Sequence, residues 1–332
     1  MTRVRRRRWV AAGAVALLVA AAGVLLALAP ELGMARAWGI AALLPARDAV
    51  TVGVGALALV CVGLALWHPS RPIAAPLAIA LLIVSAFDTP GLFARGLHNP
   101  APAPATAGQL RVLEWNTNGD LVDPAVIAAL AAREHANVVV LPEANIAFTA
   151  PQYRSDFAAA GAPMTVFAAP SAGAQAAVMM TDALAADYRQ SGAGPDVRKT
   201  LVLTPTVAGL PRIVALHAPH PVGGNTGVWR ATLDWVTQQC GDGAVLVAGD
   251  FNASIDNFGG PRLGACEDVA SEQRAGSVGT WPTKLPTPLA MPIDHVLTTR
   301  GAGVIESFTV LTGEDRSGAR HRPTLTVLQA AG

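Results

Sequence analysis

Polar residues that could bind a phosphate or a metal ion follow short apolar segments between residues 110 and 323. In VLVAGDFNAS (245–254), the carboxylate of Asp250 and the amide of Asn252 follow an apolar run two positions apart, and Gly249 permits close approach. Side chains two positions apart on an extended chain point the same way, so this pair could hold a water molecule beside a phosphoryl oxygen. Taken alone, the motif is explained as well by an Asx-rich turn without chemistry.

Two further residues of this kind end other apolar runs. Glu143 closes VVVLPE (138–143), where a carboxylate is costly to bury unless it is paired or bound to a cation. A hard, oxygen-preferring ion such as Mg²⁺ is the natural partner for it. Asn116 closes LEWN (113–116) and offers a neutral oxygen of the same type, although by itself it would be interpreted as a turn residue.

Three of the seven histidines, His217, His295 and His321, follow or lie within apolar strand patterns. A buried histidine that is oriented by a carboxylate can act as a general acid or base. For each one singly, a hydrogen-bonded structural role is the simpler interpretation. Asp294 and His295 are adjacent, so strand alternation sends them to opposite faces and they should not share a role. We expect His220 to be an ordinary surface residue.

The elements that must position these residues alternate between strands and helices. Apolar runs typical of strands occur at 110–116, 137–143, 174–181, 201–209, 212–219, 244–252, 293–299 and 323–330. Helical patterns occupy 125–136, where Asp123-Pro124 forms a start signal, and 226–240. This order predicts a mixed α/β sandwich for residues 110–332.

The first 90 residues have a different character. Val10–Ala29 carries no charge and is about as long as a membrane-spanning helix requires, and the preceding Arg3 and Arg5–Arg8 favour a cytoplasmic N-terminus. The sequence therefore predicts that residues 1–90 form a transmembrane region with three helices, at about 10–29, 50–67 and 73–87. Three spans from a cytoplasmic N-terminus place the rest of the chain on the extracytoplasmic side. The alternatives are a cleaved signal peptide, a single signal-anchor and a buried soluble bundle.

An Ala/Pro-rich linker is expected over 91–109, because HNPAPAPATAGQ favours an extended spacer that holds the following domain off the bilayer. Residues 1–100 hold nine Arg and three acidic residues, so of the 24 basic and 23 acidic residues in the chain the remainder holds 15 and 20. An acidic domain is poorly suited to non-specific binding of nucleic acid, which depends on contacts between Lys or Arg and phosphates.

Cysteine usage fits an outward-facing domain. Cys61 lies in the second apolar stretch, where it is a small apolar residue. Cys240 and Cys266 lie in the globular part and face an oxidising compartment if the topology is right, so we predict a disulfide that contributes roughly 3 kcal/mol. The alternative is two unpaired, partly buried thiols.

The ordered series of motifs, with GDFNA followed by PIDHVL and then RHRP, resembles the endonuclease/exonuclease/phosphatase superfamily, over about residues 108–328. The resemblance implies a four-layer sandwich of two mixed β-sheets flanked by helices. It also implies a hydrolase acting on phosphate esters, usually with Mg²⁺ (or Mn²⁺). The substrate would be a nucleic acid, a lipid or a small molecule, and no protein partner is implied.

By the same resemblance, Asn116 and Glu143 match the metal-binding pair, and Asp250 matches the carboxylate that activates water, with Asn252 beside it on the phosphate. The resemblance also makes His217 the first active-site histidine. It makes His321 the final histidine, which contacts the phosphate, and Asp294 its carboxylate partner. His295 takes a position that is usually structural.

One motif departs from the family pattern. The usual Ser-Asp-His is Ala319-Arg320-His321 here, so a fixed cation replaces an acidic residue that helps to hold the metal. Arg320 could clamp a phosphate oxygen, or the site could bind metal weakly, and Asp315 could compensate. The leading hypothesis is a membrane-anchored, outward-facing phosphoesterase. Its alternatives are a catalytically weakened module that binds a phosphorylated ligand and a transporter with a regulatory soluble part.

Overall fold

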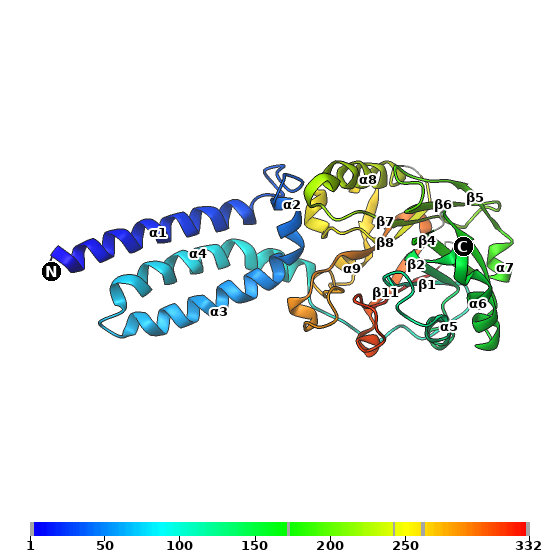
Figure 1. Ribbon diagram of the computed structural model, residues 1–332, viewed down its shortest axis with the longest axis horizontal. Coiled ribbons are helices and arrows are strands. Elements are labelled where there is room, and N and C mark those ends of the chain that lie inside the picture. Colours follow the sequence, from blue (N-terminus) through cyan, green and yellow to red (C-terminus); the bar gives the residue numbers. More distant parts are fainter. Residues whose placement is uncertain (1–2, 171–172, 242, 260–262, 330–332) are drawn as a thin grey trace.

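A helical region and an α/β domain lie end to end in the computed structural model, which describes residues 3–170, 173–241, 243–259 and 263–329 (Figure 1). The helical elements are α1 (Arg3–Ala27), α2 (Ile40–Leu43), η1 (Leu44–Ala46), α3 (Arg47–Leu66) and α4 (Arg71–Arg95). Three stretches are long and apolar enough to cross a membrane: Arg6–Ala27, Ile40–Leu66 and Arg71–Arg95. The structure thus has the three long apolar helices that the sequence predicted.

The second helix begins before its predicted span of 50–67, and the third continues beyond its predicted span of 73–87, because the charged residues in these extensions are paired. The Nε atom of Arg47 donates to Asp88 at 2.8 Å, and Arg95 forms an ion pair with Asp48. Pairing lowers the cost of burying a charge in an apolar setting. The prediction from sequence ends each helix at the charged residue, because the sequence does not show which residue will pair with that charge.

The domain contains two six-stranded sheets. The first has the order β11-β12-β1-β2-β4-β3 and the second the order β5-β6-β7-β8-β10-β9. The strands are β1 (Gln109–Glu114), β2 (Val138–Ala144), β3 (Met164–Ala168), β4 (Gln175–Thr181), β5 (Tyr188–Gly192), β6 (Thr200–Pro205), β7 (Arg212–His217), β8 (Val245–Asp250), β9 (Cys266–Asp268), β10 (Asp294–Thr299), β11 (Val304–Val310) and β12 (Thr324–Gln329). Both sheets are mixed, because β1 runs parallel to β2 and β7 runs parallel to β8 among antiparallel neighbours.

Helices cover the outer faces of the sheets and border the core between them. They are α5 (Pro124–Arg133), α6 (Ile146–Ala159), α7 (Asp182–Ala185), α8 (Thr226–Gln239) and α9 (Val269–Glu272), with 3₁₀ turns η2 (Gly223–Asn225), η3 (Ile255–Phe258), η5 (Thr287–Leu289), η6 (Arg300–Ala302) and η7 (Thr312–Glu314). Of these, α7 and α9 contribute Ala185, Val269 and Ala270 to the core between the sheets. One apolar core fills the space between the sheets, while α5 and α6 pack on the first sheet and α8 packs on the second. This is the predicted four-layer sandwich. The Asp123 side chain accepts a hydrogen bond from the Ala125 N–H and caps α5, as the sequence indicated.

The Ala/Pro-rich segment lies along the domain instead of forming a free spacer. The Asn99 side chain exchanges two hydrogen bonds with the backbone of Val310, at 2.9 and 2.8 Å, and the Ala103 N–H donates to Ser307 at 3.3 Å. Proline removes many N–H groups from this segment, and of those that remain His98 donates to the backbone oxygen of Arg274 and Thr106 donates to the side chain of Gln109. The domain therefore sits directly on the helical region.

Ion pairs and hydrogen bonds join the two parts. Asp256, in η3, accepts from Arg47 at 3.2 Å and from Arg95 at 2.9 Å. The buried Asn257 amide donates to the backbone oxygens of Ala35 and Ala41, both at 3.1 Å. Since η3 follows β8 by only a few residues, the ends of the helices are tied to the segment that carries GDFN.

A disulfide joins Cys240 at the end of α8 to Cys266 at the start of β9, with the two Cα atoms 5.3 Å apart. Cys61 is a free, buried thiol in α3. The bridge ties α8 to the edge of the second sheet, on the side of the domain that α8 covers.

Candidate active site

Strand register places three of the candidate residues side by side at one end of the second sheet. In the parallel pair of β7 and β8, His217 lies opposite Asp250, and in the antiparallel pair of β10 and β8, Asp294 lies opposite Asp250. The first sheet brings Asn116 and His321 to the same end, because β1 ends and β12 begins there. Residues that are about 200 positions apart in sequence thereby share one site.

Asp250 is the centre of this cluster and is almost fully buried. Its carboxylate accepts from the Asn116 amide at 2.9 Å and from the backbone N–H of Asn252 at 2.8 Å. The Nε2 atoms of His217 and His321 lie 3.7 and 3.9 Å from its Oδ2. Burial and then repulsion from Asp294 raise the pKa of Asp250 to about 7, against the attraction of His321 and the two hydrogen bonds. A carboxylate with this pKa can take up and release a proton near neutral pH.

His321 and Asp294 form a buried ion pair. The Nδ1 atom of His321 donates to both carboxylate oxygens, at 3.1 and 2.9 Å. Burial opposes protonation of the ring, but the charge of Asp294, its hydrogen bond and the charge of Asp250 outweigh that effect and raise the pKa of His321 to about 9. The ring is therefore an imidazolium at neutral pH, with its Nε2–H available to a ligand.

His217 has the opposite protonation state because of its burial and because of Lys199, which the sequence analysis did not single out. The Lys199 ammonium lies 3.3 Å from Nδ1 of His217 and 3.7 Å from Oε1 of Glu143. Burial, followed by repulsion from Lys199, lowers the pKa of His217 to about 3. An ammonium can only donate, so Nδ1 must accept and the single ring proton sits on Nε2, toward Asp250. His217 is thus a neutral hydrogen-bond donor, and Lys199 supplies the fixed positive charge.

The donors at Glu143 and Asn116 suit a hard divalent cation. The Glu143 side chain is 24% exposed and has Lys199 as its counter-ion. The Asn116 Oδ1 atom accepts one hydrogen bond, from the Asn118 N–H at 2.8 Å, and an amide oxygen has a second lone pair. Carboxylate and amide oxygens are the ligands that Mg²⁺ and Mn²⁺ prefer.

A second group of possible ligands consists of Asp250, Asp294 and His321, whose ligand atoms lie within 4.8 Å of one another. Here the His321–Asp294 pair already satisfies both charges without a metal ion. A protonated imidazole cannot bind a cation, so the ion must first displace a proton at this group.

Glu114 lies beneath the site and was missed by the sequence analysis. It is fully buried; one carboxyl oxygen accepts from Thr324 at 3.2 Å, and the other has no partner among the described residues. Burial, with repulsion from Asp294 and Asp250, raises the pKa of Glu114 well above its ordinary value. The sequence did contain a signal, since Glu114 shares the alternation of Leu110 and Val112, which both face the core between the sheets.

The remaining predicted residues have different surroundings. Asn252 has a φ of +44° and lies in a turn beyond β8, so turn geometry, rather than the two-residue alternation of a strand, places it beside Asp250. Its amide donates to the backbone oxygen of Ala218 at 2.8 Å. His295 points away from Asp294 and pairs with Asp268 at 3.1 Å, which confirms that the two adjacent residues face opposite sides.

Arg320 is exposed, and its side chain makes no hydrogen bond or ion pair within the described parts of the chain. Asp315 is held by Arg322, at 2.7 and 2.9 Å, so it is not available to replace the acidic residue missing at position 320.

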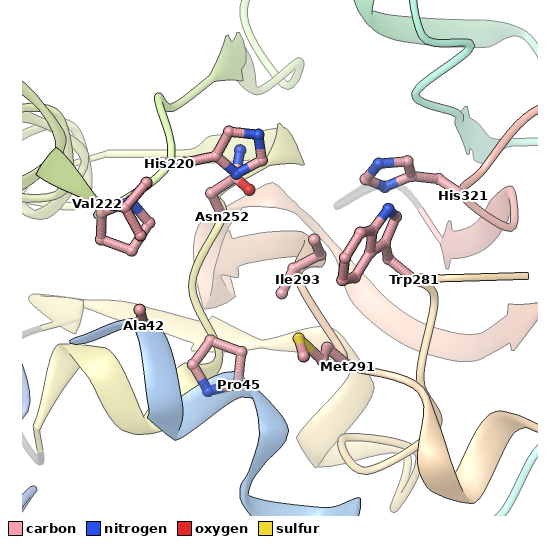
Figure 2. A pocket seen from close by; sticks show the side chains of 10 residues that line it. Ala42, Pro45, His220, Val222, Asn252, Trp281, Met291, Ile293 and His321 are labelled. Atoms are coloured by element: carbon pink, nitrogen blue, oxygen red, sulfur yellow. The ribbon is translucent and has the colours of Figure 1, made fainter. Parts of the chain in front are cut away.

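A cavity of about 240 Å³ opens beside Asn252 and His321 (Figure 2). His220, which is exposed as expected of a surface residue, lines this cavity together with Asn252. The histidines and Asn252 lie at one end, and apolar side chains lie between them and the helical region. The full lining is Ala42, Pro45, His220, Pro221, Val222, Asn252, Trp281, Met291, Ile293 and His321.

Residues 113–321 match the family model described as "Endonuclease/Exonuclease/phosphatase family". No curated protein sequence matches the chain.

Solved structures share the fold at low sequence identity. A 3′ phosphatase, NExo, from Neisseria, bound to a product DNA hairpin, is 14% identical with a TM-score of 0.52, and the match covers 65% of this chain and 98% of that one. An AP endonuclease from Archaeoglobus fulgidus is 13% identical with a TM-score of 0.53, covering 66% and 99%. TDP2 from D. rerio, in complex with a single-strand DNA product, is 18% identical with a TM-score of 0.51, covering 66% and 98%.

Proposed function

Because the chain belongs to the endonuclease/exonuclease/phosphatase family, we propose that it hydrolyses a phosphoester with the help of a divalent cation, Mg²⁺ or Mn²⁺. One observation carries the proposal: the buried Asp250 carboxylate, whose pKa is raised to about 7, lies between two imidazole Nε2 atoms at 3.7 and 3.9 Å. A base that is surrounded by donors suits the attack of water on a phosphorus atom.

Each residue has a role in this proposal. Asp250 orients the attacking water and accepts its proton, and the Asn116 amide and the Asn252 N–H fix the direction of the carboxylate. The His321 imidazolium, aligned by Asp294, donates from Nε2 to a phosphoryl oxygen and stabilises its growing charge. His217 donates as a neutral group.

Glu143 and Asn116 would hold the cation, which when bound supplies positive charge that polarises the phosphoryl oxygen. Lys199 provides a positive charge next to Glu143 before the cation arrives. Asn252 and His220 face the cavity and are placed to contact the substrate.

The helical region would anchor the domain to a membrane through three spans, with the boundaries 1–90, 91–109 and 110–332 for membrane region, linker and catalytic domain. The Arg-rich start of α1 and the turn before Arg71 lie at the end away from the domain (Figure 1). Since positive charge favours the cytoplasmic side, the N-terminus is placed in the cytoplasm and the domain outside. The Cys240–Cys266 bridge agrees with an oxidising compartment.

The test is hydrolysis of a panel of phosphodiesters and phosphomonoesters by the full chain, with and without chelator. We expect turnover that the chelator abolishes and that Asp250→Asn lowers by about 10³-fold or more, since the base is removed while its shape is kept. Asp182→Asn, an exposed aspartate on α7, is the matched control and should retain full activity. Undiminished activity of Asp250→Asn would refute its role, and binding without turnover by the wild type would instead support the ligand-binding module that Arg320 suggests.

A further inference from the structure

The cavity connects the catalytic residues to the helical region. His321 and Asn252 lie at its polar end, whereas Ala42 and Pro45 come from α2 and η1 and lie on the opposite side (Figure 2). Ala42 and Pro45 belong to the apolar stretch Ile40–Leu66, which is long enough to cross a membrane. One wall of the cavity is therefore the beginning of a candidate membrane span.

Polar interactions hold this wall in place. Asn257 binds the backbone oxygens of Ala35 and Ala41, and the Arg230 guanidinium donates to the backbone oxygen of Arg36 at 2.8 Å. These bonds fix the chain on the N-terminal side of Ala42. Asp256, paired with two arginines of the helical region, fixes it on the other side.

The wall between the two ends is apolar. Ile293 and Met291 lie between the polar end and α2, and Val222 and Trp281 line the cavity on either side in the view of Figure 2. Among the described residues that line the cavity there is no Lys or Arg. A polynucleotide needs a series of cations along its backbone, and this cavity offers charge for a single phosphate group.

Exposed apolar side chains continue the surface from the cavity wall toward the spans. Leu43, next to Ala42, is 53% exposed, and Trp38 is 80% exposed, at the same end of the helical region. Tryptophan at the end of an apolar helix is typical of the interface between bilayer and water. A lipid in the outer leaflet of a bilayer could therefore reach the cavity while its apolar chain stays in contact with apolar side chains.

We propose that the substrate is a phosphoester of a membrane lipid, with its phosphate at Asp250 and His321 and the first part of its apolar chain against Met291, Ile293 and Ala42. The proposal rests on the phosphoesterase activity proposed above. In the reaction, the oxygen of water bonds to phosphorus as one P–O ester bond breaks. The water loses a proton to Asp250, which releases it to solvent, and the departing alkoxide takes up one proton from solvent to become the alcohol.

The test uses the full chain in detergent and three p-nitrophenyl phosphodiesters whose second ester group is methyl, butyl or octyl, all kept below their micelle concentrations. Each methylene that enters the apolar cavity should raise kcat/KM by about fourfold at most, so we expect the butyl ester to exceed the methyl ester by at least about tenfold. A single-stranded oligonucleotide of equal phosphate concentration is the competing substrate.

Ala42→Glu and Val222→Glu place a charge in the cavity and should lower the butyl-to-methyl ratio to about one. Val207→Glu is the matched control, because Val207 is exposed to a similar degree (44% against 54% for Val222) on a turn between β6 and β7, and it should retain the wild-type ratio. A fourth p-nitrophenyl phosphodiester, with hexadecyl as its second ester group, is embedded in phosphatidylcholine vesicles. The wild type reconstituted into these vesicles should hydrolyse it.

The outcomes separate the two proposals. Hydrolysis of the methyl ester with no gain from longer chains, or preference for the oligonucleotide, would overturn the lipid substrate while leaving the phosphoesterase intact. A butyl-to-methyl ratio that Ala42→Glu and Val222→Glu both leave unchanged would also overturn it. No turnover of any ester by the wild type would instead remove the phosphoesterase on which it rests.

Discussion

Replacing Asp294 with Asn should turn His321 from an imidazolium into a neutral ring. Asp294 is the main force that holds the pKa of His321 at about 9, since burial acts in the opposite direction. Without this charge the pKa should fall to its ordinary value of about 6.5 or below. That drop corresponds to about 3 kcal/mol of ion-pair interaction, and both side chains are nearly fully buried, so solvent screening removes little of it. At pH 7.5 the protonated fraction would fall from about 97% to about 10% or less.

Two measurements can detect the loss of the positive charge on His321 in Asp294→Asn. Histidine ¹⁵N spectra of the chelator-treated protein should show the His321 titration move from about pH 9 to 6.5 or lower, and the alkaline limb of kcat/KM should move with it. At pH 7.5 this alone lowers kcat/KM about tenfold. Because the folded-state pKa of His321 lies above the unfolded one, its contribution to stability is complete below pH 6.5 and is lost as the pH rises through 9. The difference in unfolding free energy between wild type and variant should therefore shrink over that range.

Asp268→Asn is the matched control for this experiment. Asp268 pairs with the buried His295 at 3.1 Å, in the same domain but away from the cavity, and its charge, working against burial, raises the pKa of His295. The control should lower the pKa of His295 and leave the pH profile of activity in place. A His321 that still titrates near pH 9 in Asp294→Asn would refute the reasoning, since some other group would then stabilise its charge.

Three other predictions concern groups around the site. Glu114→Gln should make the protein more stable than the wild type, and the difference should grow by up to about 1.4 kcal/mol per pH unit as the pH rises from about 4.5 toward the raised pKa of the wild-type carboxyl. The reason is that the folded wild type must keep a proton on Glu114 that the unfolded chain releases. Thermal unfolding as a function of pH measures this difference, and equal pH profiles for both proteins would contradict it. Lys199→Met removes the cation 3.7 Å from Glu143 and should tighten Mg²⁺ binding about two- to fivefold by calorimetry, whereas the exposed Lys284→Met should not; weaker binding would show that Lys199 does not compete with the ion. Asp256→Asn removes one of the two carboxylate partners of both Arg47 and Arg95, which keep Asp88 and Asp48, and should cost about 1–3 kcal/mol, seen as a lower unfolding temperature and faster proteolysis between helices and domain; an unchanged protein would argue against a rigid junction.

The surroundings of Arg320, which replaces the acidic residue usual in the family, determine how strongly the site can bind a metal ion. Arg320 is exposed, and Asp315 is committed to Arg322, so the residues near the final motif supply no acidic side chain in place of the missing one. Glu143 is then the partly exposed carboxylate on which the proposed metal site depends. The expected outcome is Mg²⁺ binding that depends strongly on Glu143, so that Glu143→Gln lowers Mg²⁺ affinity in the same calorimetric titration.

The amino-acid sequence by itself determined the elements that carry strong local signals. Buried strands with continuous apolar runs, such as β2 and β8, and the capped helix α5 were predicted, and so were the three apolar helices. The strands at the sheet edges, β3, β5, β9 and β11, were not predicted. Their exposed or mixed side chains lack a clear period, since an edge strand is fixed mainly by its neighbour. Ordered motifs also indicated the residue types of the site, because each polar residue directly follows an apolar run.

Tertiary structure alone decided how those residues act. Lys199 and His220 have no distinguishing local pattern, and they join the site only because two sheets meet at one end. The protonation of His217 and His321, opposite in two residues of the same type, depends on whether a cation or a carboxylate lies next to each ring. The packing of α2 against the cavity was equally hidden, since sequence periodicity reports which face of an element is apolar but not which other element covers it. Charge interactions and packing act through space between residues far apart in the chain, and only the folded arrangement sets those distances.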